Sequence, residues 1–331
     1  MRAHRKTRAC CGLLALVMMI LSVPVVASGS SNEPVDDIEV GAVEWQRDLD
    51  AAIEASRRSG KPVLAFFQEV PGCSGCRSFG ATVMSYGPIV QAIEGEFLPV
   101  LIYNNRGGKD AEILDRYDEP AWNYQVIRFL DGNGRDLIPR RDRVWTRDAL
   151  AERMVRALEA AGRKVPGYLA VAAYEDDAGA QKKVAFAQSC FWNGEVQLGQ
   201  IPGVVTTEAG WFDGHEVTLV RYRPDLVSLN ALVDQAVAAG VADAVYLTTR
   251  EQQHDIGGIP GLKVGLLDGS YRRAPSSDQK RQIRNSVFAE VDLSAMQQTK
   301  VNAFVAFDTQ KATSWLTPAQ LAELERLQAR R

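Results

Sequence analysis

Two cysteines separated by only two residues, Cys73 and Cys76, are the feature that most limits how this chain can fold and act. They directly follow residues 63–67, an apolar run with the length of a buried strand. Two thiols at this spacing can open and close a disulfide within one turn of chain. A third cysteine, Cys190, stands alone beside two aromatic residues in the second half of the chain. The pattern predicts thiol chemistry at two separate places.

Residues 1–27 predict an export signal. A positively charged start precedes the apolar run 13–26, and small residues ending at Ala27 fit a cleavage site. The run is shorter than the roughly 20 apolar residues of a transmembrane helix, and an uncleaved membrane anchor is the alternative. Cys10 and Cys11 are then lost with the signal. We therefore expect an exported protein, periplasmic or extracellular, that works in an oxidising compartment without stable membrane insertion.

Composition restricts the class of protein further. Residues 28–42 form a polar leader, and the length that follows suggests two domains. Hydrophobic residues make up 46% of the chain, which is enough for ordinary globular cores. The net charge is −3 and there is no long basic run, so we expect no nucleic-acid partner. Three cysteines after the signal are too few for a disulfide scaffold and are better explained by chemistry.

The apolar periodicity of residues 43–161 predicts alternating helices and strands. The expected elements, in chain order, are an amphipathic helix from Trp45 that ends at Gly60, a strand at 63–67, a helix near Cys76, a strand at 97–102, a helix at 110–117, a strand at 125–130, a turn at 131–134, another strand, and a helix capped by Thr146. A C-x-x-C pair within such an order is typical of a thioredoxin-like redox motif.

Residues 43–161 thus resemble a thioredoxin-fold domain. The stretch from Val70 to Cys73 is similar to a bacterial thioredoxin-like group in which selenocysteine can occupy the position of Cys73. The resemblance implies that Cys73 is the exposed nucleophile and Cys76 the resolving thiol. The chain departs from the family at Gln125, which stands where a cis-proline normally faces the redox pair.

Two other roles for the cysteine pair remain open. Zinc needs about four ligands. After the signal, the chain offers only His215 and His254 besides its three cysteines, and neither histidine has ligand spacing. A permanently closed structural disulfide is the second alternative to redox chemistry.

A second pattern begins after an expected linker at residues 162–182. Its expected elements are strands at 183–188, 204–210, 217–222 and 244–248, with helices at 190–199 and after Ser228. This order is βαββαβ, the ferredoxin-like unit. A loop-rich stretch at 257–269, a helical stretch at 278–290 and capping boxes at Ser294 and Thr317 predict a helical C-terminal extension. The predicted fold class is therefore α/β and α+β: a thioredoxin fold, then a ferredoxin-like domain over residues 183–331.

Cys190 stands where the first helix of this second domain begins. The positive end of a helix dipole lowers the pKa of a cysteine toward the thiolate, which can attack the sulfur of a sulfoxide. Phe191 and Trp192 can form an apolar wall for a methyl group, and Glu195 or Glu216 can supply a proton. The alternative is a buried core cysteine without reactivity.

Order and spacing favour the reactive interpretation. Cys190-Phe191-Trp192, Glu195, Gly203-Val204, Gly210-Trp211 and Gly214-His215-Glu216 follow one another in the chain. This series resembles the A-type peptide-methionine sulfoxide reductases. The resemblance implies reduction of peptide methionine (S)-sulfoxide, with Cys190 as nucleophile and Glu216 or Glu195 as acid. It also implies substrate binding by Phe191, Trp192, Trp211 and Glu195.

The second domain also departs from that family. Ser189 replaces the glycine before the nucleophile, and Trp211 replaces a tyrosine. One residue is missing between His215 and Glu216. The later Q-Y-R segment has no match beyond Tyr271 and the arginine after it.

The cysteine inventory suggests a catalytic cycle. No cysteine follows Cys190, so its oxidised form must be resolved by another molecule or by Cys73, with Cys76 then closing the Cys73–Cys76 disulfide. We expect oxidised proteins or peptides as substrates, an upstream external thiol reductant, and no other cofactor or metal. Two alternatives remain open: a general thiol-disulfide oxidoreductase, and a non-catalytic binding module with a decayed reductase pocket.

Overall fold

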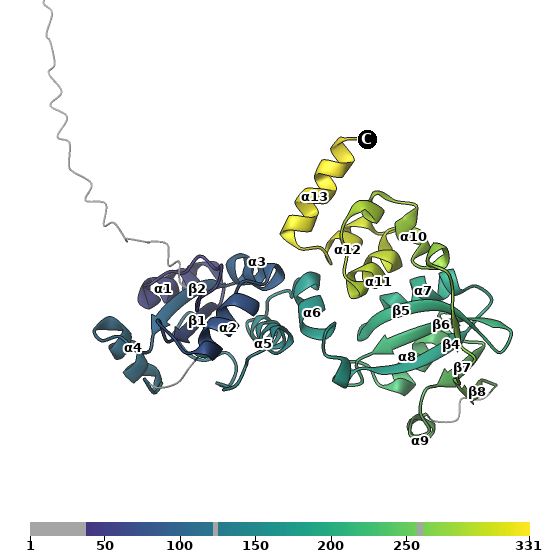
Figure 1. Cartoon of the computed structure of the whole chain (residues 1–331), viewed down its shortest axis with the longest axis horizontal. Helices are drawn as coiled ribbons and strands as arrows, with labels where there is room; N and C mark the ends of the chain where they lie inside the picture. The colour runs from purple at the N-terminus through teal and green to yellow at the C-terminus, as the bar shows by residue number, and fades with distance from the viewer. Residues whose placement is uncertain (1–37, 122–124, 257–260) are drawn as a thin grey trace, which may run out of the picture. The chain divides into compact units, whose positions relative to one another are not determined.

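The computed structural model describes residues 38–121, 125–256 and 261–331 (Figure 1). The expected signal at residues 1–27, most of the polar leader, and residues 122–124 before Gln125 lie outside this description. Within the described residues, no helix is both long and apolar enough to cross a bilayer.

The first domain is built on a three-stranded sheet of order β2-β1-β3. Strand β1 (Val63–Gln68) pairs parallel with β2 (Leu98–Tyr103) and antiparallel with β3 (Gln125–Leu130). Every residue of β1 is buried, as its apolar run predicts. The helices are α1 (Leu49–Ser59), α2 (Ser74–Thr82), α3 (Gly87–Glu96), α4 (Lys109–Tyr117), α5 (Arg147–Ala160) and α6 (Gly167–Tyr174).

Alternation along β1 divides the side chains between two cores. Leu64 and Phe66 pack with residues of α2, α3, α5 and α6, whereas Ala65 and Phe67 pack with α1 and α4. The sheet is therefore covered on both faces, which is the layered arrangement expected for a thioredoxin fold. The loop after β1 delivers Cys73 to the start of α2.

Three features of the first domain differ from the sequence expectations. A second helix, α3, follows α2 where no separate helix was predicted. It begins after its N-cap residue Tyr86, and Pro88 lies in its first turn. The strand expected after the 131–134 turn is reduced to a single bridge between Leu130 and Asp136. The expected linker contains α6, whose Leu169 belongs to the core of this domain.

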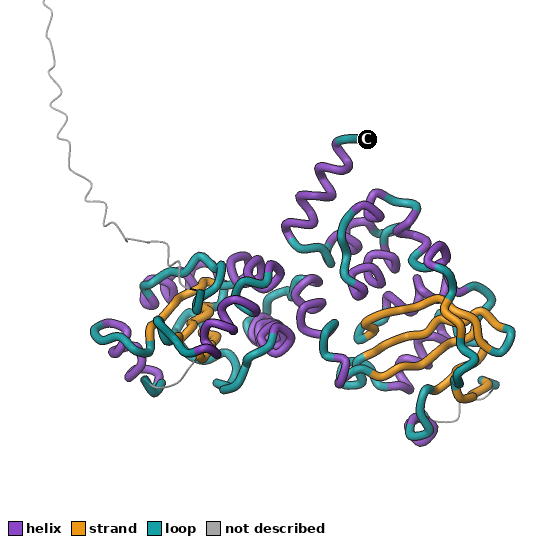
Figure 2. The backbone as a smooth tube through the Cα atoms, in the orientation of Figure 1, coloured by secondary structure: helices purple, strands orange, loops and turns teal. Residues whose placement is uncertain are grey.

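The second domain contains a six-stranded sheet of order β8-β7-β4-β6-β5-β9, drawn in orange in Figure 2. The strands are β4 (Lys182–Ala187), β5 (Val204–Phe212), β6 (His215–Tyr222), β7 (Ala244–Leu247), β8 (Lys263–Leu266) and β9 (Arg272–Arg273). The four strands β7-β4-β6-β5 pair antiparallel, which is the ferredoxin-like arrangement predicted from the βαββαβ order. Strands β8 and β9, at the two edges, were not predicted.

Helices α7 (Phe191–Gln200) and α8 (Leu229–Ala238) cover one face of this sheet. Val184 and Phe186 of β4 point to this helical face, while Ala185 and Ala187 point to the opposite face. Gly194 lets α7 approach β6 closely, because a methyl group there would overlap the hydroxyl of Thr218. The strand-to-helix connection at residues 188–190 thus holds Cys190 at one end of the sheet.

A helical extension completes the chain, as predicted. Its α-helices are α10 (Arg281–Arg284), α11 (Ala295–Phe304), α12 (Thr309–Thr313) and α13 (Pro318–Ala329). Helix α9 (Gln252–Asp255) lies earlier in the chain, between β7 and β8. Both predicted capping boxes form, at Ser294 and Thr317. The expected helix at 278–290 is instead broken into α10 and short 3-10 turns. The predicted α/β and α+β fold class is confirmed.

Candidate functional site

The Cys73–Cys76 pair lies where β1 leads into α2. Cys73 is the exposed N-cap residue of α2, and Cys76 lies buried in its first turn. The two cysteines are not joined by a disulfide; 3.1 Å separates their sulfur atoms, and Cys73 Sγ accepts a hydrogen bond from the Cys76 backbone N–H at 3.4 Å. This is the geometry of a reduced dithiol.

The two thiols have opposite acidities. A hydrogen bond from the Cys76 thiol, aided by backbone N–H groups, lowers the pKa of Cys73 below its usual value. Burial, together with the hydrogen bond to Cys73, raises the pKa of Cys76 to about 12. Because the thiolate is the nucleophile, Cys73 is equipped to attack first and Cys76 to act second.

Alkylation kinetics test this division of roles. In reduced protein, iodoacetamide should modify Cys73 with a pH midpoint below the value of about 8.5 typical of free cysteine. Cys76→Ala should move this midpoint upward, because the hydrogen bond from Cys76 is the largest cause of the lowered pKa. Peptide mass spectrometry across a pH series gives both midpoints. An unchanged or lower midpoint in the variant would contradict the assignment.

A hollow of about 340 Å³ opens beside Cys73. Gln125 lines it from the start of β3, so this residue does stand next to the redox pair, and its buried Oε1 accepts no hydrogen bond. Trp145 lines the same hollow and is 53% exposed. An exposed aromatic beside a reactive thiol provides apolar contact area for a partner chain.

Cys190 is half-buried at the N-cap position of α7. The next backbone N–H, that of Phe191, donates to Glu216 Oε2 at 2.7 Å. Glu216 reaches this position because β5 and β6 are joined by a two-residue turn at Asp213 and Gly214, both with positive φ.

Three aromatic residues surround the start of α7. The ring of Phe191 lies edge-on to Trp192 at 5.7 Å and to Trp211 at 5.4 Å, measured between ring centroids. Trp192 Nε1 donates to the backbone oxygen of Asp278 at 3.0 Å, which fixes its indole. Phe191 is buried, whereas Trp211 is 36% exposed. The structure thus brings together the predicted aromatic residues and Glu216 beside Cys190.

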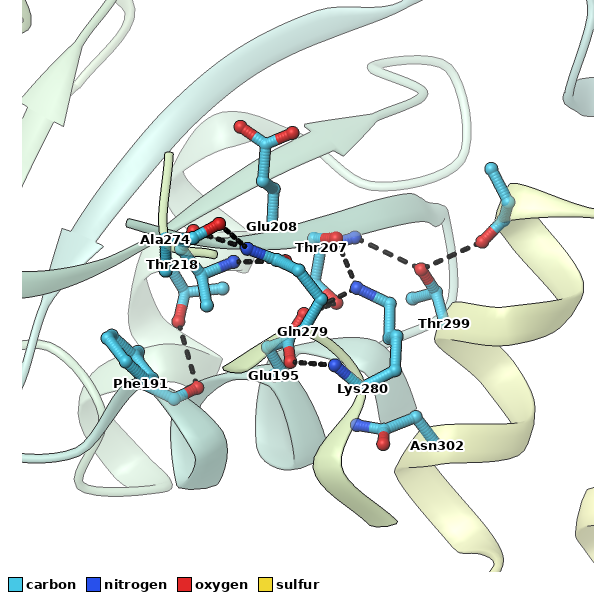
Figure 3. Close-up of polar contacts among 12 residues, drawn as sticks. Phe191, Glu195, Thr207, Glu208, Thr218, Ala274, Gln279, Lys280, Thr299 and Asn302 are labelled. Carbon is cyan, nitrogen blue, oxygen red and sulfur yellow. Dashed lines mark hydrogen bonds and ion pairs between the residues drawn. The ribbon is translucent and has the colours of Figure 1, made fainter. Parts of the chain in front are cut away.

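Glu195 is placed differently from the sequence expectation. Its side chain is 0% exposed and its carboxylate forms an ion pair with the amino group of Lys280, as Figure 3 shows. The backbone N–H of Lys280 also donates to Glu195 Oε2 at 2.8 Å, and Lys280 has a left-handed backbone with φ of 49°. A carboxylate held this way is a structural anchor. The placement does not support the expected role of Glu195 in binding substrate or donating a proton.

This anchor belongs to a wider polar network between β5 and the C-terminal extension (Figure 3). Lys280 Nζ also donates to the backbone oxygen of Thr207, and the Thr207 N–H donates to Thr299 Oγ1 at 3.2 Å. The side chain of Gln279 both accepts from and donates to the backbone of Ala209. The network fixes the segment that carries Lys280 against the strand that carries Trp211.

Tyr271, the remaining candidate for the family's Q-Y-R tyrosine, lies on the other face of the sheet. Its hydroxyl donates to Glu208 Oε1 at 2.7 Å, and burial raises its pKa. Its ring packs over Gly210, where a methyl group would overlap it. Thr207 and Ala209 face α7, so Glu208 and Gly210 face away from it.

Two residues that sequence reasoning missed contact this site. Lys280 pairs with Glu195, and the guanidinium of Arg281 lies 3.9 Å from the centre of the Trp192 ring. Neither belongs to a motif, since each is brought in by a segment about ninety residues further along the chain; the only hint is the basic character of that segment. Within the described residues there is no group of three or more His, Cys, Asp or Glu side chains that could hold a metal ion.

Residues 44–131 match the Thioredoxin-like family. No curated protein matches the chain. Similar solved structures include a DsbH oxidoreductase, with 18% identity over 40% of this chain and 96% of that chain and a TM-score of 0.31. Methionine sulfoxide reductase A of Corynebacterium diphtheriae has 15% identity, covering 40% of this chain and 85% of that chain with a TM-score of 0.28. Mxr1 from Saccharomyces cerevisiae, in an unusual oxidized form, has 15% identity over 31% of this chain and 80% of that chain, with a TM-score of 0.21.

The family match extends over the first domain alone. Together with the sheet order and the Cys73–Cys76 geometry, it defines that domain as thioredoxin-like and supports a thiol-dependent oxidoreductase.

Proposed function

We propose that the chain reduces peptide methionine (S)-sulfoxide, with Cys190 as nucleophile and the Cys73–Cys76 dithiol as electron donor. The observation that carries the proposal is the grouping at the start of α7. A half-buried free thiol, an aromatic wall of Phe191 and Trp192, and the carboxylate of Glu216 meet there. This grouping lies on the residue series that resembles the A-type reductases.

In the first half-reaction, the Cys190 thiolate attacks the sulfoxide sulfur. The S–O bond breaks, the oxygen passes to Cys190 as a sulfenic acid, and methionine leaves as the thioether. The thiol hydrogen balances the hydroxyl of the sulfenic acid. We assign the transfer of that proton to Glu216, whose Oε2 accepts from the Phe191 N–H at 2.7 Å, and not to Glu195, which is paired with Lys280.

Recycling needs two further thiols. Cys73 attacks the sulfenic acid, water leaves, and a Cys73–Cys190 mixed disulfide forms. Cys76 then attacks Cys73, which returns Cys190 as a thiol and closes the Cys73–Cys76 disulfide. Fusing donor and acceptor in one chain raises their effective concentration, to about the millimolar range for short flexible linkers. An external thiol reductant reopens the disulfide.

A single-turnover experiment tests the proposal. Fully reduced protein, freed of external reductant, is mixed with one equivalent of peptide that carries methionine (S)-sulfoxide. The proposal predicts release of one methionine per chain and formation of one intramolecular disulfide. Formation of no methionine, with the thiols still reduced, would overturn it.

A second candidate function is general thiol-disulfide exchange at the first domain. The exposed Cys73 with its lowered pKa and the hollow beside Trp145 favour it. It predicts reduction of a disulfide substrate by the Cys73–Cys76 dithiol whether or not Cys190 is present. The two functions are compatible, because they use the same dithiol at different steps.

A further inference from the structure

A basic segment passes beside the Cys190 site. Residues 272–284 contain five basic side chains and one acidic side chain, Asp278. The segment begins in β9, where Arg272 pairs directly with Trp211 of β5, and its middle is bound through the Asp278 backbone to Trp192. It therefore contacts both Trp192 and Trp211.

Three of the five basic side chains form an ion pair or a hydrogen bond with a nearby residue. Lys280 pairs with the buried Glu195, Arg273 pairs with Glu208 at 3.1 Å, and Arg284 donates to the backbone oxygen of Ser276 at 3.0 Å. Arg272 and Arg281 are exposed, and within the described residues neither forms an ion pair with a carboxylate.

These two arginines flank the aromatic wall. The guanidinium of Arg281 stacks on the ring of Trp192, with 3.9 Å from its carbon to the ring centre. Arg272 stands directly opposite Trp211 in an antiparallel pair, so the two side chains leave the sheet on the same face. Each tryptophan that contacts Phe191 thus has an arginine beside it.

Of the four nearby carboxylates, Glu195 and Glu208 are paired with other cations, whereas Glu216 and Asp278 form no ion pair within the described residues. Glu216 accepts from the Phe191 N–H, Glu195 is occupied by Lys280, and Glu208 lies on the other face with Arg273. Asp278 is the one acidic residue of the segment, which also contains Arg272 and Arg281. Two guanidinium groups and two indole rings therefore lie beside the start of α7, together with the carboxylates of Glu216 and Asp278.

We infer that Arg272 and Arg281 select acidic peptides, so that the preferred substrate is a methionine sulfoxide flanked by Asp or Glu. This inference rests on the proposed function. The planar guanidinium group suits carboxylates, because it offers parallel N–H donors, and stacking on an indole holds it in place without using those donors. The sulfoxide methyl would meet the aromatic wall while flanking carboxylates meet the arginines.

Three peptides of equal length test the inference, with methionine (S)-sulfoxide flanked by Asp, Asn or Lys. We expect kcat/KM to fall in that order, by roughly threefold for each exposed ion pair between arginine and carboxylate that the peptide can form. Arg272→Gln with Arg281→Gln should bring the three values together. Rising salt should do the same in the wild-type protein, because exposed charges are screened over about 10 Å at 0.1 M.

Arg250→Gln is the matched control. Arg250 is exposed and follows the end of β7, which runs antiparallel to β4 and so places it at the opposite end of the sheet from Cys190. This variant should keep the full preference for the acidic peptide. Equal rates for the Asp, Asn and Lys peptides at low salt would overturn the inference and leave the proposed function standing.

If no peptide is turned over, the proposed function fails, and binding then decides the inference. Fluorescence anisotropy with labelled peptides and the Cys190→Ser variant measures affinity without chemistry. Tighter binding of the Asp peptide, lost in the double arginine variant, supports the selection of acidic segments. Equal affinities for the three peptides would overturn it.

Discussion

Replacing Cys190 with serine should abolish methionine sulfoxide reduction while leaving disulfide reduction by Cys73 and Cys76 unchanged. A hydroxyl at the start of α7 keeps the backbone contacts, including the bond from the Phe191 N–H to Glu216, but supplies no thiolate to take the oxygen. Loss of a covalent nucleophile costs at least about 10³-fold in kcat. The measurement is steady-state turnover of a sulfoxide peptide with an external dithiol.

The matched variant is Cys73→Ser. This variant should lose two activities. The first is reduction of disulfide substrates, and the second is sulfoxide turnover when an upstream protein reductant supplies the electrons. Both need Cys73, because it is the exposed thiol of the pair. Sulfoxide turnover that persists in Cys190→Ser and disappears in Cys73→Ser would assign the chemistry to the first domain alone. It would leave the second domain as a binding module.

Replacing Lys280 with methionine should destabilise the second domain by about 3–5 kcal/mol, the cost of breaking a buried ion pair by removing one partner. Glu195 is 0% exposed and would lose the amino group that its carboxylate contacts. Hydrogen exchange read by mass spectrometry separates the domains. Amides of β5 and α7 should lose protection, while those of β1 should not change.

A double variant controls for loss of packing. Glu195→Leu combined with Lys280→Met removes both charges at similar volume, and such replacements are often neutral or stabilising. Protection of β5 and α7 should therefore return close to the wild-type level. If Lys280→Met alone leaves exchange unchanged, the ion pair contributes nothing to the stability of the domain, and the assignment of Glu195 as a structural anchor is wrong.

Much of the fold follows from local sequence patterns. The buried run of β1, the Thr146 cap of α5 and the capping boxes at Ser294 and Thr317 can be predicted because each depends on residues adjacent in sequence. The ferredoxin-like sheet follows from element order, because that order restricts how the strands can pair.

The features that sequence patterns miss involve contacts between distant segments. Strand β9 is only two residues long, and its pairing with Trp211 has no periodicity to reveal it. The anchoring of Glu195 could not be predicted because its partner, Lys280, lies 85 positions away. Helix α6 falls in the expected linker because its sequence is apolar on all sides, which gives no amphipathic pattern.

Electrons are proposed to pass from the Cys73–Cys76 dithiol to Cys190 within one chain. The most direct test uses a reduced Cys76→Ser variant, given one equivalent of sulfoxide peptide without external reductant, then quenched with acid and digested. We predict a peptide pair joined by a Cys73–Cys190 disulfide, formed at a rate independent of protein concentration. A lasting sulfenic acid on Cys190, with Cys73 still a free thiol, would contradict this electron transfer.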